Sequence, residues 1–418
     1  MKRWIRTAVR GALLVEVVGV AVFAAVYDSL DFRIYWLGGG AITEGTRVYS
    51  EQLAAHWFTN TPFMAALFAP VSAVPLGVAR VVWQLASVGA FAWACSAALE
   101  LAGRRPSRLA VAAAVAGGLL LEPVWHSLFL GQVNLFLLAL VLVDVRRVSL
   151  GRPAGIGIGI AAAIKLTPAI FVMLLLIAGR TRAALTAGVT FVLCGSAAFL
   201  IAPDASRLYW LHTFYDTSRV GVPYISNQSP YGAAARISGG VAHVGGWFEP
   251  VPLAIGFFGL AVAAGWAKRG DWLSAAAVAG VTGLLVSPIS WAHHWVWIVP
   301  VLILLVRNGG RAIALCGYLL FLLAPLWWTP QGGGPRQYGF HGLLTLVANC
   351  YLVAGSVFLV YMAVRLSARR GGRAPVGPIH VDGAGPGAVA FGRAPVPENA
   401  GAILGPPLRP GRRPGGPA

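Results

Sequence analysis

Residues 11–36 read GALLVEVVGVAVFAAVYDSLDFRIYW. The apolar run that opens this stretch carries Glu16 as its only charge, and its length falls within the range of about 17 to 25 residues that cross a bilayer as one helix. The run ends on Asp28 and Asp31, although the 418 residues of the chain include only 14 acidic ones. The stretch therefore predicts a first membrane helix near 9–27 that brings two rare carboxylates to the membrane surface.

The composition of the whole chain predicts an all-α, polytopic integral membrane protein. Charged residues make up 11% and hydrophobic residues 57%, whereas about 25% of the residues of a soluble domain are charged. The net charge of +18 comes from short basic clusters between apolar runs rather than from a stripe on one domain, which argues against a nucleic-acid partner. The four cysteines lie in apolar runs without C-x-x-C or His-rich spacing, so neither a zinc site nor a disulfide framework is expected. No cofactor is predicted either.

Apolar runs separated by basic connections predict about 10 to 12 membrane helices. Short connections rich in Lys and Arg belong on the cytoplasmic side of the plasma membrane, and both termini are expected there as well. The longer connections 28–79 and 204–250 carry mixed charges and are expected to be outer loops. The predicted spans lie near 9–27, 80–101, 108–124, 127–144, 183–203, 251–267, 272–287, 291–306, 311–328 and 342–364.

Three further segments depart from simple spans. Residues 154–178 lie between basic clusters that belong on one side, and Lys165 and Pro168 interrupt them, so we expect two half-spans or a re-entrant hairpin with Lys165 near its turn. Residues 61–78 contain three prolines and predict a broken helix on the outer surface. The Gly- and Pro-rich residues 371–418 predict a disordered cytoplasmic tail behind a single membrane domain that spans residues 1–370.

Ionisable residues at the lip of a membrane are energetically costly, so each is a candidate for function. Asp28 and Asp31 stand at the outer end of the first predicted span. A carboxylate in that place can take a proton from a hydroxyl group and act as a general base. The structural alternative is that both residues cap the next helix, and the two roles are compatible.

A second polar group follows in the sequence EPVWHSLFLGQVN, which begins at Glu122. His126, Gln132 and Asn134 gather there beside Trp125, at the outer end of two helices that a tight turn joins. Aromatic faces stack on sugar rings and amides bind hydroxyl groups, so this group is typical of a sugar site. Hydrogen bonds between membrane helices are the alternative explanation.

Cationic groups within apolar sequence point to a phosphate. Lys165, in AAAIKLTPAI, is the one lysine of three that lies in such a run, and lipid phosphate is the anion that a membrane supplies. Extension of the side chain to the interface is the alternative. In SPISWAHHW, His293 and His294 stand beside Trp291, and adjacent histidines point in different directions on a helix, so contact with a phosphate or sugar is favoured over metal binding. An interfacial aromatic belt is the alternative there.

An ordered series of blocks, spread over residues 10–365, resembles glycosyltransferase family 87, the polyprenol-phosphate-mannose-dependent mannosyltransferases of actinobacteria with the GT-C architecture. The chain departs from the family pattern at NTPF, residues 60–63, which concerns the acceptor side. The blocks are DFRIYW, GTRVYS, TNTPFMAALFAPVSAVPLGVARVVWQL, GQVNLFLLALVLVDV, GIAAAIKLTPAIF, NQSPYG and SPISWAHHWVWIVP.

The resemblance implies a membrane mannosyltransferase that transfers mannose from polyprenyl-phosphate mannose, with inversion and without metal, on the extracytoplasmic face. The acceptor would be a membrane-embedded glycolipid or glycan of the phosphatidylinositol mannoside or lipomannan type. Asp31 would be the catalytic base and Asp28 its neighbour, while Lys165, His293 and His294 would face the donor phosphate. The residues expected to contact substrate are Arg33, Tyr35, Gln132, Asn134, Asn227, Gln228 and Trp291.

Three other functions fit parts of the sequence. An arabinofuranosyl or other polyprenyl-phosphate-sugar transferase of the same fold would use the same phosphate-binding residues. A lipid or sugar transporter would explain the broken segment 154–178, but transporters place polar residues near the midplane and often contain inverted repeats. Here the polar residues cluster at outer helix ends, and no repeat is found. A membrane scaffold would not need Asp31, Lys165 and His293 at compatible depths.

Overall fold

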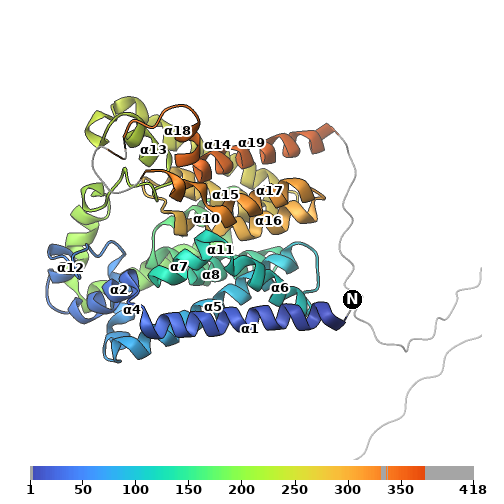
Figure 1. Ribbon diagram of the computed structural model, residues 1–418. Coiled ribbons are helices and arrows are strands. Elements are labelled where there is room, and N and C mark those ends of the chain that lie inside the picture. The colour runs from blue at the N-terminus through green and yellow to red at the C-terminus, as the bar shows by residue number, and fades with distance from the viewer. Residues whose placement is uncertain (1–2, 331–335, 337, 372–418) are drawn as a thin grey trace, which may run out of the picture. The chain divides into compact units, whose positions relative to one another are not determined.

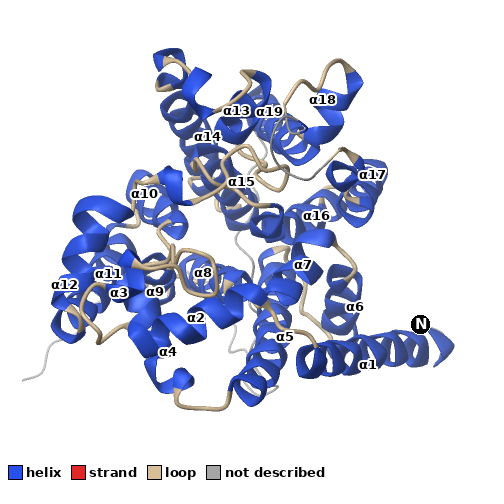
Figure 2. Ribbon diagram, turned by 60° about the vertical axis from the view of Figure 1, so that its left-hand side comes forward, coloured by secondary structure: helices blue, strands red, loops and turns tan. Residues whose placement is uncertain are grey.

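A computed structural model describes residues 3–330, 336 and 338–371 of the chain. These residues form helices and loops without a β-strand (Figure 1, Figure 2), which confirms the all-α prediction. The predicted tail lies outside the described residues, apart from its first residue. The α-helices are α1 (Arg3–Val26), α2 (Leu30–Ala41), α3 (Arg47–Ser50), α4 (Pro62–Ser72), α5 (Leu76–Leu101), α6 (Arg108–Leu119), α7 (Glu122–Leu130), α8 (Asn134–Ser149), α9 (Ile156–Ile164), α10 (Ile170–Ile177), α11 (Thr181–Ile201), α12 (Pro203–Leu208), α13 (Pro230–Ile237), α14 (Pro250–Ala267), α15 (Trp272–Val286), α16 (Ile298–Arg307), α17 (Arg311–Leu323), α18 (Leu343–Ala348) and α19 (Cys350–Gly371). Shorter 3-10 or π turns are η1 (Thr167–Ala169), η2 (Tyr209–Thr213), η3 (Thr217–Arg219), η4 (Val241–His243), η5 (Gly246–Phe248), η6 (Ala292–Trp297) and η7 (Pro325–Trp328).

Several helices are long and apolar enough to cross a membrane by themselves. Within the described residues these are α1, α5, α11, the segment Gly246–Ala267 that contains α14, and the segment Cys350–Ala368 of α19. The helices α6 and α7 pass the same test as a pair that is bent by 76°. Shorter apolar helices, among them α15 and α17, occupy other predicted spans. The chain is thus a multi-pass membrane protein, and the total of about 10 to 12 spans stays a prediction.

The predicted boundary between the spans near 108–124 and 127–144 is wrong. The short helix α7 lies between α6 and α8 and is bent by 76° from α6. Pro123 in the first turn of α7 prevents the continuation of α6, because proline has no N–H and its ring clashes with the preceding turn. Gly131, with a φ of +74°, then ends α7 in the left-handed conformation that favours glycine.

The predicted break in residues 154–178 is confirmed. Lys165 has an extended backbone (φ −147°, ψ 132°) between α9 and η1, and α10 continues from there. The start of α9 is held by Asp144, whose Oδ2 accepts from the backbone N–H groups of Gly155 at 3.0 Å and Ile158 at 2.9 Å. A carboxylate stabilises a helix N-terminus, so α9 is a defined short helix rather than an irregular loop.

The basic connections meet at one end of the helix bundle. Figure 1 shows the beginning of α1 and the end of α19 at one end, with α2, α4 and α12 at the opposite end. Ion pairs, a hydrogen bond and a cation–π contact link the basic connections to one another. These contacts are Arg146 with Glu100, Arg307 with Asp271, Arg180 with Trp272, and Arg269 with the carbonyl oxygen of Leu366.

At the opposite end, α2 packs against α4 so closely that Gly39 is required. A Cβ built on Gly39 would lie 2.5 Å from the backbone carbonyl of Phe68, whereas one on Gly40 would lie 4.0 Å from its nearest neighbour, Ser72. We expect Gly39→Ala to lower the midpoint of thermal unfolding in detergent, by an amount that corresponds to about 1 to 3 kcal/mol of overpacking. Gly40→Ala should leave the midpoint nearly unchanged. Equal midpoints for the two variants would contradict this packing.

Candidate active site

Asp31 lies partly exposed in the first turn of α2, and an amide holds its carboxylate. Gln132 Nε2 donates to Asp31 Oδ2 at 2.6 Å, and the buried Tyr35 hydroxyl donates to Gln132 Oε1 at 2.7 Å. Gln132 reaches α2 because the turn before α8 passes very close to it. A Cβ on Gly131 would lie 2.5 Å from the Cβ of Phe32. The structure thus brings together three of the predicted site residues.

Asp28 is occupied by other contacts. Its carboxylate pairs with Arg33 at 2.8 Å and with Arg80 at 3.1 Å. The buried Arg80 also donates from Nε to a carbonyl oxygen at the end of α1. Ser29, not an aspartate, occupies the N-cap position of α2. Asp28 therefore fixes the junction between α1 and α2, Arg33 lies in that ion pair, and Asp31 makes no ion pair among the described residues.

The electrostatic surroundings favour Asp31 as a proton acceptor. Burial raises the pKa of Asp31 above its usual value, and the hydrogen bond from Gln132 and the charges of Lys165, His126 and His56 oppose part of that rise. A carboxylate with a raised pKa is a stronger base once it is ionised. The charge of Lys165 thus acts on Asp31, although the two residues are far apart in the sequence.

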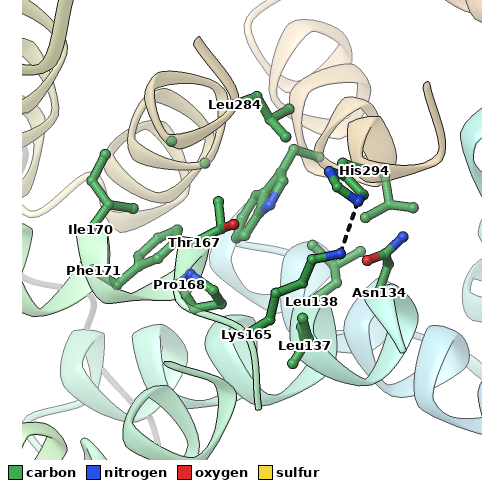
Figure 3. Close-up of a pocket in the computed structure, with 14 residues that line it drawn as sticks. Asn134, Leu137, Leu138, Lys165, Thr167, Pro168, Ile170, Phe171, Leu284 and His294 are labelled. Carbon is green, nitrogen blue, oxygen red and sulfur yellow. Dashed lines mark hydrogen bonds between the residues drawn. The ribbon is translucent and has the colours of Figure 1, made fainter. Parts of the chain in front are cut away.

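Lys165 lines a cavity together with Asn134 and His294 (Figure 3), and apolar residues of α8, α10 and α15 form much of its remaining wall. Lys165 Nζ lies 2.8 Å from His294 Nε2. Because an ammonium group only donates, the His294 nitrogen accepts, and the ring carries its proton on Nδ1. A neutral ring does not balance the ammonium charge. The pair can therefore hold an anion such as a phosphate.

Thr61 holds the backbone break from which Lys165 extends. Its Oγ1 donates to the carbonyl oxygen of Ala163 and lies 3.3 Å from that of Ile164, at the end of α9, where helical carbonyls lack partners. Thr61 also caps α4, because it accepts from the N–H of Met64 at 3.3 Å. Sequence reasoning missed this residue. The available signal was a threonine directly before a proline at the start of an apolar run.

The backbone next to His294 is held by the turn region between α7 and α8. The carbonyl oxygen of His293 accepts from Ser127 Oγ at 2.9 Å and from Asn134 Nδ2 at 2.8 Å. The His293 side chain is only 4% exposed, and neither of its ring nitrogens has a hydrogen-bond partner. Its ring centroid lies 4.7 Å from that of His294. The predicted histidine pair thus meets Lys165 through His294, and the two unpartnered nitrogens belong to the buried ring of His293 behind it.

Asn227 and Gln228 do not line the cavity that contains Lys165. The Asn227 side chain donates to the carbonyl oxygens of Val222 and Pro288 and accepts from two backbone N–H groups, one of them that of Ser290. Gln228 donates twice to backbone carbonyls and accepts from a backbone N–H. The Asn227 amide therefore holds the loop that precedes the histidines, and the Gln228 amide joins its own turn to the junction between α18 and α19. The sequence predicted substrate contacts for both residues.

Trp291, the remaining predicted substrate contact, stands partly exposed at the start of η6. Its ring centroid lies 6.1 Å from that of Tyr224. Among the residues that the structure describes, no three His, Cys, Asp or Glu side chains are grouped so that they could hold a metal ion. The site as a whole presents a hydrogen-bonded carboxylate on α2 and, across the start of α8, an ammonium group with two histidines.

Comparison with known proteins identifies a family and several relatives. Residues 58–288 match Glycosyltransferase family 87. A polyprenol-phosphate-mannose-dependent alpha-(1-2)-phosphatidylinositol mannoside mannosyltransferase of Mycobacterium tuberculosis is 31% identical over 388 residues, with 82% of this chain and 88% of the relative covered. A polyprenol-phosphate-mannose-dependent alpha-(1-2)-phosphatidylinositol pentamannoside mannosyltransferase of Mycolicibacterium smegmatis is 30% identical over 367 residues, with 83% and 85% covered. No solved structure matches the chain.

The apolar helices and the relatives define a multi-pass membrane glycosyltransferase. The chain belongs to glycosyltransferase family 87.

Proposed function

We propose that the protein transfers mannose from polyprenyl-phosphate mannose to a membrane glycolipid of the phosphatidylinositol mannoside or lipomannan type. The names of its relatives support the donor and the class of acceptor. The observation that carries the proposal is the pairing of Lys165 with His294 at 2.8 Å. The ammonium charge of Lys165 also opposes part of the rise that burial causes in the pKa of Asp31. One site thus contains a base and an anion-binding group.

We infer that the reaction is an inverting displacement. Asp31 takes the proton of an acceptor hydroxyl, and the hydroxyl oxygen forms a bond to the anomeric carbon. The bond from that carbon to the phosphate oxygen breaks, and its electron pair stays on the polyprenyl phosphate. Lys165 and the histidines stabilise the charge that develops on this leaving group. Attack from the face opposite the phosphate converts a β-linked donor into an α-linked product.

The two ends of the bundle support an active site on the extracytoplasmic face. The basic connections contact one another at the end where α1 begins and α19 ends, and basic connections belong in the cytoplasm. Asp31 lies on α2, which is at the opposite end. An enzyme on that side uses a donor that is already anchored in the bilayer, because nucleotide sugars stay in the cytoplasm.

The test is sugar transfer by the purified chain in proteoliposomes. We expect it to transfer mannose from polyprenyl-phosphate mannose to a short synthetic α-mannoside, and the new linkage to be cleaved by an α-mannosidase. Polyprenyl-phosphate arabinofuranose is the competing donor, and preferred transfer of arabinose would replace the mannose assignment. Movement of either donor across the bilayer without any product would indicate a transporter and overturn the proposal.

A further inference from the structure

Glu122, at the start of α7, is a fully buried carboxylate that the proposed reaction does not use. Three side chains point their donors at it: His126 Nδ1 at 2.7 Å, Trp327 Nε1 at 3.0 Å and the Tyr351 hydroxyl at 3.0 Å. A buried carboxylate is costly unless donors and a positive partner compensate it. His126 is the one of these donors whose side chain can carry a positive charge.

This contact determines the state of His126. A carboxylate oxygen can only accept, so Nδ1 of His126 carries a hydrogen and Nε2 is the free end of the ring. A doubly protonated ring donates to Glu122 from Nδ1 and can donate to a second anion, such as the donor phosphate, from Nε2. His126 then presents an Nε2–H donor on the side of the ring that faces away from Glu122.

The rings of His126, His293 and His294 form a row that ends at Lys165. The centroid of His126 lies 5.2 Å from that of His293, at an interplanar angle of 83°, and His293 lies 4.7 Å from His294, which contacts Lys165. His293, in the middle of this row, is buried with both ring nitrogens unpartnered. A buried ring nitrogen without a partner is energetically costly unless a ligand pairs with it. The row therefore has the character of an incomplete anion site.

We propose that His126 is a further ligand of the donor phosphate, and that Glu122 is the positioning residue that holds its Nε2–H toward that phosphate. The inference rests on the proposed function. Departure of the polyprenyl phosphate changes its charge from about −1 to −2, and a charged hydrogen bond strengthens as that charge grows. No proton leaves His126, since the acceptor proton goes to Asp31.

Two substitutions of His126 separate a phosphate contact from a structural role. The amide of His126→Asn reproduces the position of Nδ1 and keeps the contact with Glu122, whereas the amide of His126→Gln reaches the position of Nε2. The measurement is the affinity of the purified chain for farnesyl phosphate and for farnesol, which lacks the phosphate. We expect His126→Asn to weaken farnesyl phosphate binding by about 10- to 100-fold, and His126→Gln to retain most of it, with farnesol binding unchanged.

Glu122→Gln tests the positioning role. It should weaken farnesyl phosphate binding by about tenfold, without an effect on farnesol or on the KM for the mannoside acceptor. Equal losses for both ligands, or equal losses in His126→Asn and His126→Gln, would overturn the inference in favour of a structural role, and so would unchanged binding in all variants. If the unaltered chain does not prefer farnesyl phosphate to farnesol, the phosphate site of the proposed function is itself wrong.

Discussion

Replacing Asp31 with asparagine is expected to lower the rate of mannose transfer by about 10³-fold, because general base catalysis contributes about 10² to 10⁴-fold. The amide keeps the shape of the side chain and can still accept a hydrogen bond from Gln132, which lies 2.6 Å from the carboxylate. It cannot take up the proton of the acceptor hydroxyl. The measurement is kcat for transfer from polyprenyl-phosphate mannose in proteoliposomes.

The matched control is Asp28→Asn, three residues earlier in the chain. This variant weakens ion pairs with Arg33 and Arg80 in which the aspartate is 47% exposed, and such partly exposed pairs contribute little. We expect it to cost less than about tenfold in kcat, mainly through a looser junction between α1 and α2. A loss in Asp28→Asn as large as that in Asp31→Asn would show that the base has been assigned to the wrong residue or that neither is the base.

The second large effect is expected for Lys165→Met. Methionine retains much of the apolar stem but removes the charge that stabilises the departing phosphate, so kcat should fall by about 10² to 10³-fold. Lys268→Met is the control, since Lys268 is the other lysine that the structure describes and lies exposed at the C-cap of α14. The measurement is the rate of mannose transfer by equal amounts of the two folded variants. Retention of more than a tenth of the rate in Lys165→Met would remove Lys165 from the phosphate site.

Most of the helices could be predicted because their signals are local. The length of an apolar run determines whether it can cross a bilayer, so α11 and α14 were predicted within a few residues, as was the end of α1. The break at Lys165 was predicted from one charge and one proline. The bend between α6 and α7 was missed, although Pro123 stood in the sequence, because hydropathy alone continues across it.

The sequence by itself determined the class of the protein and the positions of most spans. It also limited the candidates for function to the few polar residues at the ends of apolar runs. Their partners were decided by the tertiary structure alone. Gln132, 101 residues from Asp31, distinguishes that carboxylate from Asp28, which Arg80 engages from 52 residues away. Lys165 meets His294 across 129 residues. Hydropathy acts on each segment separately, whereas hydrogen bonds and ion pairs depend on which helix ends the packed bundle brings together.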